Sequence, residues 1–259
     1  MRSSSLDRFE LSGALAVVIG ATDGIGAAIA EALAGAGAGV VITARDAARL
    51  ERTRRKVQAA GGEVHTATVD VRRPESIQAL GEAVLDRHGP PTILVNSAGI
   101  SGTKPAFEIT VEDWDAIHET QLRGVFLACQ TFGRPMAERG YGKIINLSST
   151  WAVTVHHGRS AYSAAKAGLS HLTAALAAEW APHGIRVNAI APTATRTPAA
   201  QGRMDAQPGR EDQLRSMIPL GRIAEPEDVQ GAAVFLASQA SDFVTGHTLF
   251  VDGGFRFAR

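Results

Sequence analysis

Short apolar runs alternate with helical stretches along this chain, and this alternation constrains the fold more than any other feature. The apolar runs occupy residues 14–20, 39–45, 63–71, 91–99, 143–148, 185–191 and 247–254. Strands that alternate with helices build βαβ units with right-handed crossovers. We therefore predict an α/β fold with a mostly parallel, seven-stranded sheet flanked by helices, formed by residues 1–259 as a single domain.

Composition limits the classes of function. The 259 residues carry 26 basic and 26 acidic side chains, a balance that gives no sign of a nucleic-acid or membrane partner. The single cysteine, Cys129, excludes an internal disulfide framework and fits a reducing compartment. Residues 1–13 lack the apolar core of a secretory signal, and no apolar run approaches the ~18 residues of a membrane span. We expect a soluble, cytoplasmic protein.

A glycine-rich turn follows the first apolar run. Glycine lets a ligand approach the backbone closely, and a helix N-terminus offers free N–H groups to a phosphate. The spacing G-x-x-x-G-x-G differs from the usual dinucleotide fingerprint, and alone it would indicate no more than a turn. Its position between a buried strand and a helix predicts a nucleotide site. The candidate residues are Gly20, Thr22, Asp23, Gly24, Ile25 and Gly26.

Further cofactor candidates follow the next strands, because ligands of open α/β sheets bind at the carboxyl ends of the strands. Asp70 and Val71 close the third apolar run. Asn96, Ala98 and Gly99 close the fourth run, with small residues where a cofactor must pass.

Arg45 bears on the choice of cofactor. A carboxylate at the end of the second strand would hold a ribose 2′-hydroxyl, whereas a nearby arginine accommodates a 2′-phosphate. Arg45, preceded by Ala44, therefore favours NADP(H), while the charge of Asp23 favours NAD(H), which stays possible. The alternative is that Arg45 is an ordinary solvated arginine at the start of a helix.

Tyr162 and Lys166 are four residues apart at the start of a helical stretch, so their side chains lie on one face. A tyrosine has a pKa of about 10, and a nearby cation lowers that pKa, which lets the phenol exchange a proton with a hydroxyl or carbonyl oxygen. Ser149, after the run at 143–148, could hold the same oxygen. A Tyr-x-x-x-Lys pair alone is usually a surface pair, so its meaning depends on the other motifs.

Together these residues resemble the short-chain dehydrogenase/reductase family from about Leu11 to Gly254. GATDGIG resembles the family's glycine motif and NSAG its NNAG motif, while IRVNAIAP and TGHTLFVDGG resemble later landmarks. Ser149, Tyr162 and Lys166 match its catalytic group. The order and spacing are specific, although each motif alone is weak. The resemblance implies a Rossmann-type, doubly wound sheet, a nicotinamide cofactor, no metal, and oxidoreduction of a secondary alcohol or ketone.

Three positions depart from the family pattern. Ile19 replaces a threonine that carries a structural hydroxyl, and Thr193 replaces a glycine. Gln121 stands where the family has its fourth catalytic residue, an asparagine that holds a water linking the lysine to solvent. Glutamine keeps the amide and displaces it by one methylene. The proton relay is therefore open to question, though not the chemistry of the serine, tyrosine and lysine.

The resemblance also implies roles. Tyr162 would act as acid in reduction and base in oxidation, Lys166 would lower the Tyr162 pKa and hold the nicotinamide ribose, and Ser149 would bind the reacting oxygen. Residues 193–212 carry prolines and no regular pattern, and would form the substrate lid. Thr197 would contact the nicotinamide carboxamide. Pro192, Thr193 and Thr195 complete the cofactor candidates, and Trp151 joins Ser149 and Tyr162 on the substrate side.

The substrate stays open among a sugar or polyol, an oxoacyl thioester, and a cyclic or hydrophobic secondary alcohol. His156, His157 and Arg159 could line its pocket, although an exposed loop pair is the expected state of the two histidines. A second hypothesis is a cofactor-binding protein with little turnover and a regulatory or assembly role. Gln121 permits it, and the other three catalytic residues oppose it.

Apolar residues surround two predicted helices, 104–138 and 161–182, and three phenylalanines lie in the C-terminal segment. A helix that is apolar on all sides is buried, and one sheet covers only one side of it. We predict a homotetramer with one two-fold interface on the helices and another on the C-terminal segment. The residues concerned are Phe126, Leu127, Leu169, Leu172, Leu176, Trp180, Phe250, Phe255 and Phe257, and Trp114 and Phe132 are expected in the core or at the same contact.

Overall fold

The computed structural model describes residues 5–100 and 102–258, and its strands form one seven-stranded sheet of order β3-β2-β1-β4-β5-β6-β7. Every pair of neighbouring strands in this sheet is parallel. The predicted doubly wound, Rossmann-type α/β fold is therefore confirmed. The strands are β1 (Leu15–Ile19), β2 (Gly39–Ala44), β3 (Val64–Thr68), β4 (Ile93–Asn96), β5 (Gly142–Leu147), β6 (Ile185–Pro192) and β7 (Thr248–Val251).

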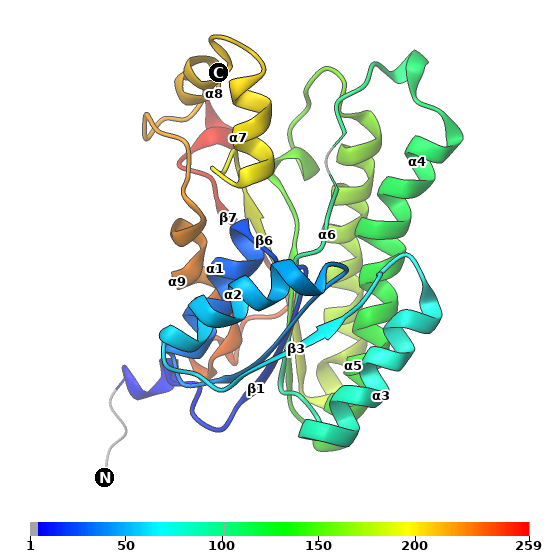
Figure 1. The fold of residues 1–259 in the computed structure, drawn as a ribbon, viewed down its shortest axis with the longest axis vertical. Coiled ribbons are helices and arrows are strands. Elements are labelled where there is room, and N and C mark those ends of the chain that lie inside the picture. The colour runs from blue at the N-terminus through cyan, green and yellow to red at the C-terminus, as the bar shows by residue number, and fades with distance from the viewer. Residues whose placement is uncertain (1–4, 101, 259) are drawn as a thin grey trace.

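Helices cover both faces of the sheet (Figure 1). One layer holds α1 (Gly24–Gly35), α2 (Ala47–Ala59) and α9 (Gln230–Ala237). The other holds α3 (Pro74–His88), α5 (Gly124–Arg139) and α6 (Ser160–Trp180), with α4 (Val111–His118) against α6. Because successive side chains of a strand point to opposite faces, Val18 packs in the first layer and Val17 in the second. None of the described helices is long and apolar enough to cross a membrane.

The start of α4 follows from a capping box. Thr110 Oγ1 accepts a hydrogen bond from the Asp113 amide at 3.2 Å, and Asp113 Oδ2 accepts one from the Thr110 amide at 3.1 Å. The helix therefore begins at residue 111, as the capping-box pattern TVED of residues 110–113 predicts from the sequence, and not at 104, where the apolar pattern begins. The expected long helix is also interrupted, because a π-helical turn at Glu119–Arg123 joins α4 to α5.

The segment expected to be an irregular lid contains two short helices, α7 (Pro198–Asp205) and α8 (Arg210–Ser216). Thr197 caps α7, since its Oγ1 accepts from the Ala200 amide at 3.1 Å. Pro198 occupies the first helical turn, where a missing N–H costs nothing. Pro198 and Pro208 favour irregular chain in the sequence, and a helix of two turns is too short to show an apolar period.

Only some of the apolar side chains that the sequence predicts at a subunit interface are exposed. Leu169 and Leu176 of α6 are buried in the core beside Phe132, whereas Trp114 and Phe126 remain 42% and 38% exposed. The C-terminal phenylalanines also differ. Phe257 is exposed, but Phe255 is buried, with its ring centroid 5.4 Å from that of Trp151.

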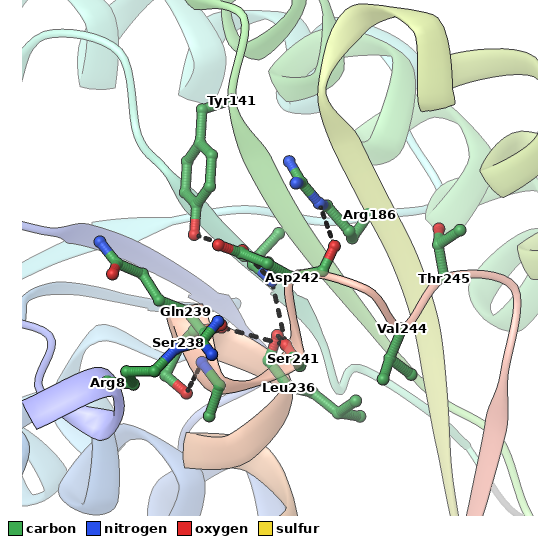
Figure 2. Close-up of polar contacts among 12 residues, drawn as sticks. Arg8, Tyr141, Arg186, Leu236, Ser238, Gln239, Ser241, Asp242, Val244 and Thr245 are labelled. Carbon is green, nitrogen blue, oxygen red and sulfur yellow. Dashed lines mark hydrogen bonds and ion pairs between the residues drawn. The ribbon is translucent and has the colours of Figure 1, made fainter. Parts of the chain in front are cut away.

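An ion pair between a buried lysine and a partly exposed aspartate lies near the amino ends of β5 and β6. The fully buried Lys143 places its Nζ 2.9 Å from Asp242 Oδ1 and 3.0 Å from Ser241 Oγ. Figure 2 shows Asp242 between Tyr141 and Arg186: the Tyr141 hydroxyl lies 3.3 Å from Asp242 Oδ1, and Arg186 Nε donates to the Asp242 carbonyl at 3.0 Å. Burial is the main cause that lowers the pKa of Lys143. This cluster joins the sheet to the C-terminal part of the chain.

Candidate active site

The sheet contains a switch point between β1 and β4. β1 pairs with β2 on one side and with β4 on the other, so successive strands are added in opposite directions from this place. Ligands of open α/β sheets bind outside the carboxyl ends of strands at such a point. A cavity of about 610 Å³ opens there, and we call it the cofactor cavity.

The glycine turn forms one wall of the cofactor cavity. Gly20 has a φ of 89°, and a Cβ added to it would lie 2.4 Å from the Ala98 nitrogen. A Cβ on Gly26 would lie 2.1 Å from the Gly20 carbonyl oxygen. No larger residue fits at either position without moving the backbone. The result is a bare-backbone cradle at the N-terminus of α1, the arrangement that suits a pyrophosphate.

Most of the residues predicted for the cofactor line this cavity. They come from the ends of β1, β2, β3, β4 and β6, from α1 and α6, and from the residue that caps α7. The lining includes Gly20, Thr22, Asp23, Gly24, Ile25, Gly26, Arg45, Asp70, Val71, Ala98, Gly99, Tyr162, Lys166, Pro192 and Thr197.

Three predicted cofactor residues do not line it. Asn96 is buried beneath the cavity, and its Nδ2 donates to Asn146 Oδ1 at 2.9 Å and lies 3.3 Å from Cys129 Sγ. It therefore links β4 to its neighbours instead of facing the crevice. Thr193 and Thr195 lie after the end of β6 and line a second cavity, because the chain has turned away from the crevice at that point.

The second cavity measures about 500 Å³ and adjoins the first; we call it the substrate cavity. Ser149, Trp151 and Tyr162, the residues predicted for the substrate, all line it. His156 and His157 line it too; His157 is exposed, as expected for a loop, whereas His156 is half-buried. Six residues border both cavities, namely Ile25, Ser148, Tyr162, Pro192, Thr197 and Arg203.

Tyr162 and Lys166 face the site from the first turns of α6. Lys166 is buried, and its Nζ donates to the Leu147 carbonyl at 2.6 Å and lies 5.7 Å from the centroid of the Tyr162 ring. Burial lowers the pKa of Lys166 to about 7. Burial also raises the pKa of Tyr162, and hydrogen bonding to Ser149 and the charges of Arg159 and Arg203 oppose that rise.

The expected lowering of the Tyr162 pKa by Lys166 is therefore wrong for the ligand-free site. Desolvation of the phenol outweighs the neighbouring charges, and the lysine ammonium is turned to a carbonyl at the end of β5. Ser149 is oriented by a local contact. It caps the turn Thr150–Ala152, with its Oγ accepting from the Trp151 amide at 3.2 Å.

Gln121 lies in the π-helical turn and lines the cofactor cavity. The residue is only 1% exposed, and its Nε2 donates to the Ile100 carbonyl at 2.5 Å. Its Oε1 lies 3.3 Å from the position of a Cβ added to Gly99. The amide thus supports the loop that leaves β4. Single π-turns within α-helices often mark functional positions.

The carboxylates of the cofactor cavity are paired. Asp23 forms an ion pair with Arg49, and Asp70 Oδ2 lies 2.6 Å from Arg72 Nη2. The Arg72 hydrogen bond lowers the pKa of Asp70 to about 2. Arg45 is exposed at the cavity edge and has no ion-pair partner among the residues that the structure describes.

Several lining residues were not predicted. Ser148 and Arg72 stand next to predicted residues. Their positions at or just after the ends of predicted strands are the sequence signal that identifies them. Arg203 could not be found in this way, because it belongs to α7, a helix without a sequence signature.

A cradle for a dinucleotide and a tyrosine shared with a second cavity define a nucleotide-dependent oxidoreductase. Comparison with known proteins gives the same class. A family model described as enoyl-(acyl carrier protein) reductase matches residues 20–256. The D-threitol dehydrogenase of Mycolicibacterium smegmatis is 40% identical over 95% of this chain and 94% of its own length. The 2-dehydro-3-deoxy-D-gluconate 5-dehydrogenase of Bacillus subtilis is 41% identical over 96% of both chains.

A similar solved structure indicates the same class of protein. The gluconate 5-dehydrogenase of Burkholderia cenocepacia, in complex with NADP and tartrate, superposes with a TM-score of 0.94 at 36% identity and covers 99% of this chain and 100% of its own. This protein belongs to the short-chain dehydrogenase/reductase family, and it is an NAD(P)-dependent oxidoreductase that acts on CH–OH groups.

Proposed function

We propose that this protein interconverts a secondary alcohol and a ketone on a sugar or polyol, with NADP(H) as the favoured cofactor. The observation that carries the proposal is the position of Tyr162, which borders both the cofactor cavity and the substrate cavity. The polyol and sugar-acid dehydrogenases among the relatives support the substrate class.

The first cavity fits a dinucleotide, since Gly20 and Gly26 leave bare backbone at its wall and α1 begins there. When bound, the nicotinamide supplies or accepts the hydride. Tyr162 would give a proton to the carbonyl oxygen in reduction and take one from the hydroxyl in oxidation. Its raised pKa keeps the phenol protonated in the free enzyme at neutral pH. Ser149 would hold the same oxygen, and Lys166 would hold the ribose.

The preference for NADP(H) rests on Arg45 and on the pairing of the nearby carboxylates. A 2′-phosphate needs a cation without a competing partner. Arg45 offers one, while Asp23 and Asp70 are neutralised by arginines.

We place Gln121 at the position of the family's fourth catalytic residue. Its bond to the Ile100 carbonyl supports a role in fixing the loop after β4. Turnover of Gln121→Asn tests whether the longer amide also serves the proton relay.

Residues 193–212 would form the substrate lid of a single-domain enzyme. They contain α7 and lead into α8, and their N-terminal part lies against the glycine turn: Thr197 Cγ2 is 2.7 Å from the position of a Cβ on Gly24. The lid would thereby contact both ligands.

A homotetramer fits the exposed apolar side chains. Phe107, Val111 and Trp114 are exposed on and before α4. Leu220 and Phe257 are exposed near the C-terminal segment, where the Leu220 amide bonds to the Gly253 carbonyl at 3.1 Å. Two separate patches suit two kinds of two-fold interface. Light scattering of the purified protein at micromolar concentration measures the mass, and a stable monomer would contradict this assembly.

A substrate panel tests the function. Alditols, ketoses, oxoacyl thioesters and cyclic alcohols are assayed with NADP(H) and NAD(H) by nicotinamide absorbance. We expect turnover of an alditol or ketose. Preference for a thioester or a cyclic alcohol would refute the proposed substrate class.

A further inference from the structure

Basic side chains line the substrate cavity, and acidic side chains are absent from the lining that the structure describes. Arg159, Arg203 and Arg210 border it together with His156 and His157. The lining that the structure describes contains no aspartate or glutamate. Arg159 and Arg210 are partly buried and Arg203 is exposed, and a cleft lined by one sign of charge attracts a ligand of the opposite sign.

The acidic residues of α7 and α8 have hydrogen-bond or ion-pair partners outside the substrate cavity. Glu211 pairs with Arg196 at 2.7 Å, and Asp212 pairs with Arg215 at 2.9 Å. Asp205 accepts a hydrogen bond from Gln201 at 2.7 Å. None of these three acidic side chains lines the substrate cavity.

Arg159 lies close enough to Arg203 and Arg210 for their charges to act on it. The pKa of Arg159 is lowered, first by burial and then by the charges of Arg203 and Arg210. Arg159 keeps its place because its Nη1 donates to the Gly102 carbonyl at 3.2 Å, and its guanidinium carbon lies 5.8 Å from the centroid of the Tyr162 ring. Arg210 is partly buried and donates to the neutral Gln213 at 2.7 Å. An anion bound in the cavity would stabilise the charged form of these arginines.

The arginines also have a definite place relative to the reacting group. Tyr162 and Arg203 border both cavities, whereas Arg159 and Arg210 line the substrate cavity only. A cofactor phosphate could therefore engage Arg203, but the lining gives it no access to the other two. An anion at Arg159 and Arg210 would belong to the substrate.

We propose that the substrate carries a carboxylate or a phosphate besides the carbon that is oxidised or reduced, and that Arg159, Arg203 and Arg210 bind this group. The inference rests on the proposed function and narrows its substrate class from polyols in general to acidic ones. Carboxylate and phosphate both suit a guanidinium, which donates to either in a bidentate manner.

Matched compounds test the proposal. Four- to six-carbon alditols, the aldonates of the same configuration and the corresponding alditol phosphates are compared by kcat/KM with NADP⁺. We expect one of the two anionic series to exceed the neutral alditols by about tenfold or more, since hydrogen bonds to charged groups are the strong ones. The preferred series identifies the source of the charge. Neutral alditols that match or exceed both anionic series would overturn the proposal and leave the proposed function intact.

Substitutions locate the effect. In Arg210→Gln and Arg159→Gln the ratio of anionic to neutral kcat/KM should fall by about tenfold, and Arg210→Lys should retain most of it. Arg215→Gln, which removes an exposed arginine of α8 outside the cavity, is the control and should leave the ratio unchanged. An unchanged ratio in both glutamine variants would overturn the proposal.

A binding measurement separates this inference from the proposed function. If no compound is turned over, the proposed function fails. Calorimetry of each aldonate, each alditol phosphate and the neutral alditol of the same configuration with the NADPH-saturated enzyme then still tests the anion site. Tighter binding of the anion, lost in Arg210→Gln, supports the anion site. Equal or weaker binding of the anion contradicts it.

Discussion

Lys166 Nζ donates a hydrogen bond to the carbonyl oxygen of Leu147 at 2.6 Å, so the lysine of α6 is tied to the last residue of β5. This contact fixes the ammonium in the crevice between the strand ends. Among the residues that the structure describes, the polar contact of this ammonium is with a neutral carbonyl, and burial lowers the pKa of Lys166 from 10.5 to about 7. The stability of the ligand-free enzyme should therefore depend on pH through this residue.

The sign follows from proton counting. The folded-state pKa is below the unfolded one, so between pH 7 and about 10.5 the unfolded chain binds a proton that the folded chain has released. Stability should rise with pH across this window by about 1.4 kcal/mol per unit relative to Lys166→Met, and the difference should level off below pH 7. Urea unfolding of both proteins from pH 7.5 to 9 measures it. Lys56→Met, at an exposed position of α2, should behave like the wild type. Parallel pH profiles for wild type and Lys166→Met would contradict the assignment.

Arg45 should decide the cofactor. We expect NADPH to bind more tightly than NADH, and Arg45→Ala to weaken NADPH by roughly tenfold, about 1.4 kcal/mol, with little effect on NADH. The reason is the loss of a cation at the edge of the cofactor cavity. Titration of both cofactors measures the dissociation constants, and Arg52→Ala, an exposed arginine outside the cavity, serves as the control. Unchanged NADPH affinity in Arg45→Ala would show that other parts of the cavity set the preference.

Gln121 should tolerate asparagine better than an apolar residue. If Gln121 occupies the position of the family's asparagine, as proposed above, Gln121→Asn should raise turnover by less than tenfold, or about 1.4 kcal/mol of barrier. Gln121→Leu keeps the approximate size but leaves the Ile100 carbonyl without its donor, and should destabilise the protein by about 1–3 kcal/mol. Steady-state kinetics and urea unfolding measure the two effects. A larger rise in Gln121→Asn would mean that the glutamine impairs the relay.

Substitution of Lys143 and of Asp242 should change the free energy of unfolding by different amounts. Lys143→Met replaces a fully buried ammonium by an apolar side chain of similar length and should change the free energy of unfolding by less than about 1.5 kcal/mol. Asp242→Leu leaves the ammonium without its counter-charge and should cost about 2–3 kcal/mol, because the aspartate is 32% exposed and water relieves part of the penalty. Urea unfolding compares them. A larger loss in Lys143→Met would show that the ion pair is itself strongly stabilising.

The sequence was most informative where a backbone constraint leaves a residue signature. Gly20 and Gly26 predicted the cradle, because any side chain there meets backbone, and the capping box of Thr110 and Asp113 predicted the start of a helix. The alternation of apolar runs predicted a parallel sheet, since strands buried on both faces are apolar throughout.

Features that depend on contacts between distant parts of the chain could not be predicted from the sequence. Asn96 ends a strand like a cofactor residue, but its direction is set by Asn146 and Cys129 on neighbouring elements. Phe255 looked exposed because its partner, Trp151, is far away in the chain. The direction of the Tyr162 pKa required knowledge of how deeply the phenol is buried.

The central claim is that Tyr162 exchanges the proton of the reacting oxygen. Tyr162→Phe removes the hydroxyl and keeps the ring, so NADPH binding should change little while kcat falls by the ~10²–10⁴ typical of a lost general acid or base. The matched control is Tyr141→Phe, which removes the other tyrosine hydroxyl of the chain, at the far end of the sheet.

The most direct measurement is therefore kcat for wild type, Tyr162→Phe and Tyr141→Phe with the best substrate of the panel, alongside NADPH titration of each protein. We predict a loss of at least about a hundredfold in Tyr162→Phe alone, with NADPH affinity retained. Near-normal turnover in Tyr162→Phe would contradict the account.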